Sequence, residues 1–445
     1  MTLPAHLSMT APTIRQDEML AALRNAPISA IRGITHYYTP RACFTDAGGT
    51  TVLTDGQEIL RANDQIGAVN ATATATNGLV YVANMWNGFP GWRSNDTSND
   101  KLTATNALAS GYGNASFYVV ISMPTQNADT VVAIGGADWY LLKTAEIMGA
   151  NLGDLTDAQT DLPEIISNFG VLWVTYDGTT RRVGFNGHYL DEAASGTLAP
   201  GADLLIGALG AGDFGNDDAF GEVVTCNVAH TIDESKAVVS QLLNLYGIHS
   251  TLTCDGNSLM MGTGSEALTK HGTCVGAQLQ ALLPQTVFAN YGIGGQTTTN
   301  MNSDRDATTL KTVMPLSDKN ICFLWEATNE IEAGTSAAST YANLVTYAAA
   351  MQAVGFKVIV GTVLDRDWAS DDAAKDAVRL QVNSMIRAQG LDDFDGIVDF
   401  ETVPELTDCS DTDYFQTDAI HLNEDGAGLA AAKIAAVFEQ VRRRA

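Results

Sequence analysis

The second half of the chain alternates short apolar runs with segments whose apolar residues recur at helical spacing. Strands that alternate with helices in this way are typical of a parallel sheet with crossover helices. The expected strands are residues 251–254, 286–289, 321–325, 356–361 and 397–400. The expected helices are residues 264–283, 337–353, 373–389 and 428–443. Residues 249–445 are therefore predicted to form a three-layer α/β/α domain.

The first half has a different pattern, in which short alternating runs follow one another between Gly, Asn and Asp turns. The runs are residues 116–123, 130–134, 171–176, 181–185, 203–206 and 220–228. The segment Asp177-Gly178-Thr179-Thr180 carries a β-hairpin signal. Strands at this density favour an antiparallel β-sandwich. We expect it over residues 46–248, with a closing helix at residues 233–246.

The first 45 residues hold one amphipathic stretch, residues 14–25, and a second apolar segment, residues 28–38. This stretch is too small to fold alone, so we expect an N-terminal arm that docks on the sandwich or on a partner.

No apolar run approaches the length of about 20 residues that a membrane span needs. The N-terminus also lacks the basic and then apolar pattern of a signal peptide. We therefore expect a soluble product without a signal peptide.

Polar residues and glycines follow four of the expected strands. Ser258 follows the first, Gly294 and Gly295 follow the second, Asn329 follows the third, and Asp418 and His421 come after the fifth. Because ligands of open α/β sheets bind outside the carboxyl ends of the strands, these residues are expected to share one rim.

These residue types together favour acyl transfer. A serine hydroxyl attacks only when a base removes its proton, and a neutral histidine suits that task, so His421 is the expected base for Ser258. Asp418 would orient the imidazole and stabilise its charged form. The oxyanion would be met by the backbone N–H groups of Ser258 and Gly295 and by the amide of Asn329. This chemistry requires no metal and no organic cofactor.

Four segments carry a family resemblance, namely Asp255-Gly256-Asn257-Ser258, Asn290-Tyr291-Gly292-Ile293-Gly294-Gly295-Gln296-Thr297, Glu326-Ala327-Thr328-Asn329-Glu330 and Asp418-Ala419-Ile420-His421. In this order they resemble the blocks of the SGNH or GDSL hydrolases, a family of lipases, esterases and carbohydrate deacetylases. The resemblance implies a flavodoxin-like α/β/α fold and a Ser258, Asp418 and His421 triad. It also implies an oxyanion hole made by Ser258, Gly295 and Asn329. The expected substrate contacts are Asn257, Gly294, Gln296 and Glu330.

The sequence departs from the family pattern at three positions. Asn257 stands where Asp is usual, Ala327 replaces a glycine two residues before Asn329, and Glu330 replaces the Asp that usually follows it. Each block alone has a plainer interpretation, as a turn or as a helix cap. All four in order favour the hydrolase. The remaining histidines, among them His188, His230, His249 and His271, are expected at the surface or in the core.

The sandwich pattern is similar to concanavalin-like and laminin-G-like jelly rolls, which often bind glycans. It carries no diagnostic motif. Five aromatic residues are candidates for sugar stacking, although core positions are the commoner role of such residues. They are Trp86, Trp92, Tyr112, Trp139 and Trp173. A Gly-rich loop with Asp213, Asn216, Asp217 and Asp218 is expected to be a solvated acidic loop, with Ca²⁺ binding as the alternative.

A formal net charge of −27 argues against nucleic acid and anionic membranes as partners. The six cysteines are scattered singly, which favours reduced thiols over a disulfide or metal framework.

The expected function is removal of O-acetyl or similar acyl groups from a surface polysaccharide. The missing signal and the N-terminal arm suggest a fibre or spike of a phage-like particle, with the arm bound to other particle proteins; a cytoplasmic enzyme is the alternative.

Two rival functions stay open at this level. One is a non-catalytic glycan-binding structural or adhesion protein, in which the hydrolase fold serves only for recognition. The other is a lipase or thioesterase for soluble acyl substrates. The glycan, the acyl group and the oligomeric state, a homo-oligomer included, are not determined by the sequence.

Overall fold

The computed structural model describes residues 27–73, 78–93, 100–107, 114–122, 130–133, 139–143, 147–152, 158–161, 169–193, 203–207, 219–263, 273–304, 312, 314, 319–368 and 372–444. Several sequence predictions lie outside these residues or concern side chains that are not described. They are the stretch 14–25, Tyr112, His271, the acidic loop with Asp213, Asn216, Asp217 and Asp218, and the side chain of Trp139.

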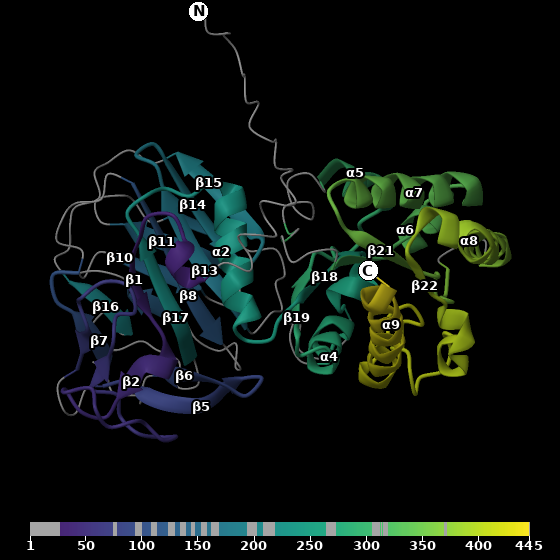
Figure 1. Ribbon diagram of the computed structural model, residues 1–445. Helices are drawn as coiled ribbons and strands as arrows, with labels where there is room; N and C mark the ends of the chain where they lie inside the picture. Colours follow the sequence, from purple (N-terminus) through teal and green to yellow (C-terminus); the bar gives the residue numbers. More distant parts are fainter. Residues whose placement is uncertain are drawn as a thin grey trace, which may run out of the picture.

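The N-terminal half consists of antiparallel sheets, as expected (Figure 1). The large sheet has the order β15-β14-β13-β8-β17-β6-β5, and β1 also pairs with β17. Its strands are β1 (Ile34–Tyr38), β5 (Val80–Trp86), β6 (Phe89–Arg93), β8 (Ala115–Ser122), β13 (Phe169–Tyr176), β14 (Thr180–Phe185), β15 (His188–Ala193) and β17 (Ala219–Cys226).

Two smaller antiparallel sheets accompany it. The five-stranded sheet has the order β16-β7-β4-β3-β2, and the four-stranded sheet has the order β12-β11-β10-β9. Their strands are β2 (Cys43–Phe44), β3 (Arg61–Ala62), β4 (Ala71–Thr72), β7 (Lys101–Ala104), β9 (Thr130–Ala133), β10 (Trp139–Lys143), β11 (Ile147–Leu152), β12 (Ala158–Asp161) and β16 (Leu204–Gly207). A jelly-roll connection of these sheets stays a prediction.

The central strands of the large sheet are buried on both faces. On β8, Phe117 and Val119 belong to the core between the sheets, whereas Tyr118 and Val120 belong to a second core on the opposite face. Successive side chains of a strand point to opposite faces, so this division follows directly from the strand geometry. The second core also contains helix α2 (Ile232–Asn244) and two hydrolase residues, Val287 and Met314. We call it the shared core.

Part of the expected N-terminal arm is a strand of the sandwich. β1 pairs with β17 in antiparallel register, with Tyr37 opposite Val224 and Tyr38 opposite Val223. The Tyr38 ring is fully buried in the core between the sheets, and its hydroxyl donates to the carbonyl of Val69 at 2.6 Å. Residues 34–38 are therefore docked on the sandwich, one of the two placements expected for the arm.

The C-terminal half has the expected five-stranded parallel sheet, with the order β19-β18-β20-β21-β22. In chain order this is 2-1-3-4-5, the arrangement of flavodoxin-like folds. The strands are β18 (Ser250–Gly256), β19 (Thr286–Asn290), β20 (Asn320–Trp325), β21 (Lys357–Gly361) and β22 (Gly396–Val398). The three-layer α/β fold of this half is therefore confirmed.

Helices cover both faces of this sheet (Figure 1). α4 (Val275–Leu282) and α9 (Glu424–Arg444) contribute to the core on one face, and α7 (Ala337–Ala353) and α8 (Asp372–Asp393) contribute to the core on the other. Shorter helices stand near the strand ends, and 3-10 turns complete the connections. They are α3 (Ser258–Met261), α5 (Thr298–Asp304), α6 (Thr328–Glu332) and the turns Ile28–Ala30, Pro40–Ala42, Phe400–Thr402 and Pro404–Leu406.

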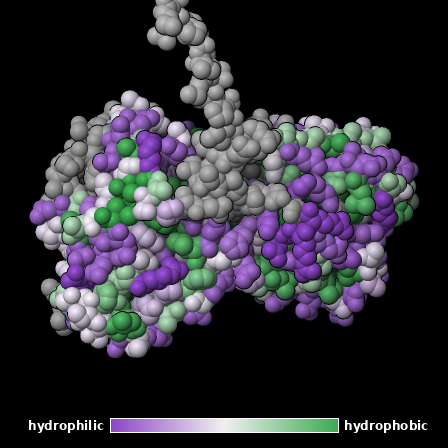
Figure 2. Space-filling view, in the orientation of Figure 1, coloured by the Kyte–Doolittle hydropathy of each residue, from purple (hydrophilic) through white to green (hydrophobic). Residues whose placement is uncertain are grey.

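The surface of the hydrolase half is largely polar on one face. Figure 2 shows hydrophilic side chains gathered over the hydrolase half on the face in view. Within the described residues, no helix is both long and apolar enough to cross a membrane. All six cysteines are free thiols, and five of them are buried.

Candidate active site

Ser258 begins the short helix α3, directly after strand β18. Asn257 is the N-cap of this helix, and its side-chain oxygen accepts a hydrogen bond from the N–H of Leu259 at 2.9 Å. The first N–H groups of a helix have no acceptor within the helix, and the N–H of Ser258 is the first of α3. The sharp change from strand to helix thus presents both the hydroxyl and the N–H of Ser258 at the strand end.

The structure brings the three predicted triad residues together. His421 Nε2 lies 2.8 Å from Ser258 Oγ, and His421 Nδ1 lies 2.6 Å from Asp418 Oδ2. An ionised Asp418 accepts the Nδ1 proton, which leaves Nε2 as the acceptor for the serine hydroxyl. Ser258 and His421 are partly buried, whereas the Asp418 side chain is 45% exposed.

The carboxyl group of Asp418 is held in its ionised form. Its Oδ1 accepts hydrogen bonds from the N–H groups of Ile420 and His421 at 2.9 and 3.0 Å. Burial works to raise the pKa of Asp418, but the hydrogen bonds from His421 and from these backbone groups outweigh it and leave the pKa below its ordinary value. Asp418 is therefore a carboxylate at neutral pH, as the orientation of His421 requires.

Residues 292–296, which we call the oxyanion loop after their predicted role, follow strand β19, and the N–H of Ile293 donates to the carbonyl of Gly256 at 3.0 Å. Gly295 adopts a left-handed conformation with φ of +75° and is exposed, which explains the need for glycine at this position. Asn329 donates one amide N–H to the carbonyl of Gln296 at 2.7 Å. An amide carries two N–H groups, so this bond orients the side chain and uses one of them, while the expected oxyanion role of Asn329 stays a prediction.

The segment before Asn329 contains a strained residue. Ala327 has φ of +117°, is fully buried and forms the N-cap of α6. A left-handed conformation at a residue other than glycine costs about 1–3 kcal/mol and persists only where its surroundings enforce it. Ala327 thus holds a positive φ that glycine adopts more readily, at the position where the family resemblance leads us to expect glycine.

The four residues expected to contact substrate have different surroundings. Gly294 is exposed, and its N–H points to Met261 Sδ at 3.1 Å. Asn257, Gln296 and Glu330 are buried. Glu330 accepts hydrogen bonds from Thr298 and from Asn343. The burial of these three side chains favours positioning roles, and substrate contact stays a prediction.

Sequence analysis assigned no role to Glu326, which follows strand β20. Its side chain is 1% exposed, and neither carboxyl oxygen has a hydrogen-bond partner among the described residues. Burial raises its pKa well above the ordinary value, and the nearby Asn257 side chain and the N–H groups of Ala327 and Asn329 only partly oppose that shift. An acidic residue directly after the apolar run 321–325 is the signal that marks this position.

Replacing Glu326 by glutamine is expected to remove a pH dependence of stability. The unfolded chain loses the Glu326 proton above about pH 4.5, whereas the folded protein retains it to a higher pH. The folded state therefore binds more protons in this window, and the free energy of unfolding falls by up to about 1.4 kcal/mol per pH unit as pH rises. Denaturant titrations of wild type and Glu326→Gln between about pH 5 and pH 7 measure the difference in slope.

The control for this comparison is Glu424→Gln, because Glu424 is exposed. We expect Glu424→Gln to retain the slope of the wild type. A Glu326→Gln protein whose stability runs parallel to the wild type at every pH would show that Glu326 is ionised in the folded state.

The aromatic candidates for sugar stacking lie mostly in the interior. Trp92 and Trp173 are fully buried. Trp86 stacks on Phe169 with ring centroids 4.9 Å apart and donates its indole N–H to the carbonyl of Pro284 at 3.2 Å. These side chains therefore serve packing and domain contact.

Two other histidines of the sequence analysis are also internal. His230 is buried and pairs with Tyr118, and His188 is buried and pairs with Tyr291 of the segment that precedes the oxyanion loop. A core position was one of the two expected for His188, and its contact with Tyr291 is not indicated by the sequence pattern.

Comparison with solved structures finds similar chains. A lipolytic protein of the G-D-S-L family from Veillonella parvula is 24% identical, with 43% of this chain and 99% of that chain covered and a TM-score of 0.36. A psychrotrophic esterase from Pseudoalteromonas is 14% identical, with coverage of 43% and 97% and a TM-score of 0.34. A lipase/acylhydrolase from Enterococcus faecalis is 14% identical, with coverage of 44% and 96% and a TM-score of 0.35.

Comparison with curated proteins gives no match. The family model of the GDSL-like lipases and acylhydrolases matches residues 254–429. This range contains every strand end that carries a predicted catalytic residue, from Ser258 to His421. The C-terminal half of the chain therefore contains a domain of the GDSL-like lipase/acylhydrolase family.

Proposed function

We propose that the chain is a serine esterase that removes O-acetyl or similar acyl groups from a surface polysaccharide. The observation that carries the proposal is the hydrogen-bonded series from Asp418 through His421 to Ser258, with distances of 2.6 and 2.8 Å. Gly295 and Asn329 lie on the segments that follow the two strands flanking β18. The expected nucleophile and the expected oxyanion donors thus follow three neighbouring strands of one sheet, which supports the proposal.

In the first step, Ser258 Oγ attacks the carbonyl carbon of the acyl group while His421 Nε2 takes the hydroxyl proton. The negative charge that develops on the carbonyl oxygen is met by the N–H groups of Ser258 and Gly295 and by the amide of Asn329. The bond from the carbonyl carbon to the sugar oxygen then breaks, and His421 returns the proton to that oxygen. Asp418 stabilises the charged imidazole while it holds the proton.

In the second step, water hydrolyses the acyl group on Ser258. His421 takes a proton from the water as its oxygen attacks the acyl carbon, and the same oxyanion donors stabilise the intermediate. The bond to Ser258 Oγ breaks, and His421 returns the proton to this oxygen. The products are the free carboxylic acid and the starting enzyme.

The surroundings of the nucleophile favour a bulky alcohol with a small acyl group. Gly294 and Gly295, on the loop expected to form part of the oxyanion hole, are exposed, which leaves room for a long chain to approach them. Ile293 is 54% exposed on the same loop and offers a small apolar contact for an acyl methyl group. The fused antiparallel sheets add a second body next to the esterase, which suits a polymeric substrate.

We also propose that this polysaccharide belongs to a cell surface reached by a phage-like particle, with the N-terminal arm as the attachment point. This part of the proposal rests on the domain order, in which antiparallel sheets precede the hydrolase domain. Immunodetection of the protein on purified particles tests it. Its presence only in the producing cell's cytoplasm would contradict the particle setting and leave the esterase chemistry untouched.

The test of the substrate class is acetate release from O-acetylated polysaccharides by the full-length protein, with Ser258→Ala as the matched control. We expect release from at least one polymer by the wild type and none by the variant. Hydrolysis of p-nitrophenyl acetate without acetate release from any polymer would favour the lipase or thioesterase alternative. Binding to the polymers without hydrolysis of either substrate would favour the non-catalytic glycan-binding protein.

A further inference from the structure

The hairpin of strands β14 and β15 contacts the hydrolase domain next to its oxyanion loop. His188, the first residue of β15, lies with Nδ1 3.0 Å from the hydroxyl oxygen of Tyr291. Both side chains are buried, with 4% and 5% of their surface exposed. This hydrogen bond joins residues 103 positions apart in the chain. The contact therefore belongs to the packing of the two halves against each other.

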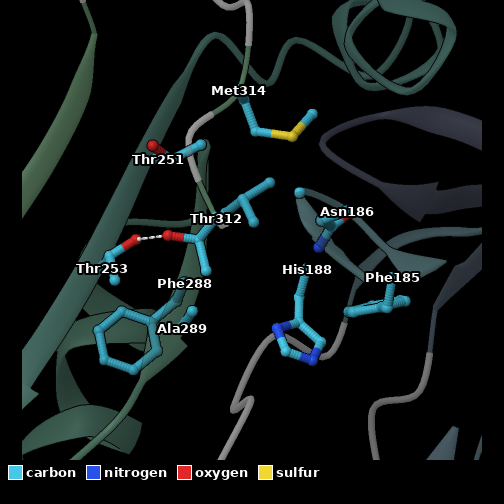
Figure 3. Close-up of a pocket in the computed structure, with 11 residues that line it drawn as sticks. Phe185, Asn186, His188, Thr251, Thr253, Phe288, Ala289, Thr312 and Met314 are labelled. Carbon is cyan, nitrogen blue, oxygen red and sulfur yellow. Dashed lines mark hydrogen bonds between the residues drawn. The ribbon is translucent and has the colours of Figure 1, made fainter. Parts of the chain in front are cut away.

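The packing around this bond is close. In Figure 3 the hairpin residues Asn186 and His188 face Thr312 and Met314 across a small cavity. Its volume of about 20 Å³ is room for roughly one water molecule. A Cβ at Gly187, the turn residue between the two strands, would lie 2.3 Å from the carbonyl oxygen of Thr312. The turn thus touches the hydrolase backbone and leaves no space for a larger residue.

Tyr291 connects this contact to the oxyanion loop. Its N–H donates to the carbonyl of Cys254 at 2.8 Å, and the N–H of Ile293 donates to the carbonyl of Gly256 at 3.0 Å. Gln296, at the far end of the loop, accepts the amide of Asn329. The loop is thus tied at one end to β18 and at the other end to an oxyanion donor. The phenol hydroxyl of Tyr291 is the point at which the sandwich holds it.

We propose that His188 is a positioning residue for the esterase, acting through Tyr291 on the oxyanion loop. The inference rests on the proposed function, because it assigns the loop the task of stabilising an oxyanion. The sandwich then supplies part of the active-site framework. Small displacements matter here, because a donor stabilises the transition state only where it meets the oxygen at about 2.7–3.1 Å.

The experiment compares Tyr291→Phe and His188→Ala with wild type in the full-length chain. Hydrolysis of p-nitrophenyl acetate is measured at a temperature well below the unfolding temperature of each protein. Each variant is expected to lower kcat about tenfold, a fraction of the loss that follows removal of an oxyanion donor, and to change KM less than about twofold. His188→Asn, which places an amide near the position of Nδ1, is expected to restore most of kcat. The double variant is expected to be no slower than either single variant, because both remove the same bond.

A control is available in the sandwich. The hydroxyl of Tyr118 lies 2.7 Å from Nδ1 of His230, also buried, and donates to Ser235 Oγ at 3.1 Å. Tyr118→Phe removes a tyrosine–histidine bond of the same type together with the bond to Ser235, so it is expected to lower the unfolding temperature without lowering kcat. An active wild type whose Tyr291→Phe and His188→Ala variants have unchanged kcat overturns the inference alone. A wild type that hydrolyses no ester overturns the proposed function and the inference with it.

Discussion

Replacement of Ser258 by alanine is expected to lower kcat for p-nitrophenyl acetate by about 10⁴–10⁶. Without Oγ no acyl-enzyme forms, and His421 loses the hydroxyl that lies 2.8 Å from its Nε2 in the wild type. What remains is attack by water within the oxyanion hole, which accounts for the residual rate seen when other serine hydrolases lose their nucleophile. Steady-state rates, with the initial burst of p-nitrophenol measured separately, provide the comparison.

The control is Ser384→Ala, since Ser384 is exposed on helix α8 and lies in none of the four catalytic segments. Its rate is expected to equal the wild-type rate. A fluorophosphonate reagent should add mass to the wild type and to Ser384→Ala, but not to Ser258→Ala. Labelling of Ser258→Ala at the wild-type rate would place the nucleophile elsewhere in the chain.

Replacement of Asp418 by asparagine is expected to lower kcat by about 10³. The neutral amide no longer stabilises the charged imidazole, and its NH₂ group allows the wrong tautomer of His421. A fully buried aspartate in this role is worth about 10⁴. The loss should be smaller here, because the Asp418 side chain is 45% exposed and water partly replaces it. Initial rates at saturating substrate measure the effect.

The fold should survive this change, since the remaining Oδ1 can still accept the N–H groups of Ile420 and His421. Circular dichroism melting of Asp418→Asn beside wild type verifies this point. Asp413→Asn, an exposed change in the same loop, serves as the control for the loss of charge. A loss of less than about fivefold in Asp418→Asn would mean that another group orients His421.

The hydrolase half follows closely from the sequence because parallel strands are buried on both faces and appear as continuous apolar runs. The strand expected at residues 321–325 spans Asn320–Trp325 in the structure. The helix expected at residues 337–353 has the same bounds in the structure. The strands of the antiparallel half are visible too, since the runs expected at 116–123 and 171–176 correspond to β8 and β13. Both strands are buried on both faces, so the alternation separates two cores and not core from solvent.

The triad was accessible to sequence reasoning because each of its residues follows a recognisable strand and lies in a short motif. The contact between His188 and Tyr291 was not, because it depends on how two independently patterned halves pack together. Glu326 lies between the two cases. Its position after an apolar strand is visible in the sequence, but its burial is evident only once Asn257 and Ala327 are placed around it.

The shared core has a consequence for chimaera design and for recombination of this chain with others. A cut near residue 249 would separate Val239 and Trp173 from Val287 and Met314, which belong to one buried cluster. Each fragment would then expose apolar surface to water, and this exposure costs about 25 cal/mol of free energy for each Å². A transplanted esterase half would therefore need a new cover for β19 or replacement of its apolar contact residues by polar ones. If either half is exchanged for a foreign domain, we expect the hybrid protein to fold only when the β14–β15 hairpin and helix α2 are kept together with the esterase half.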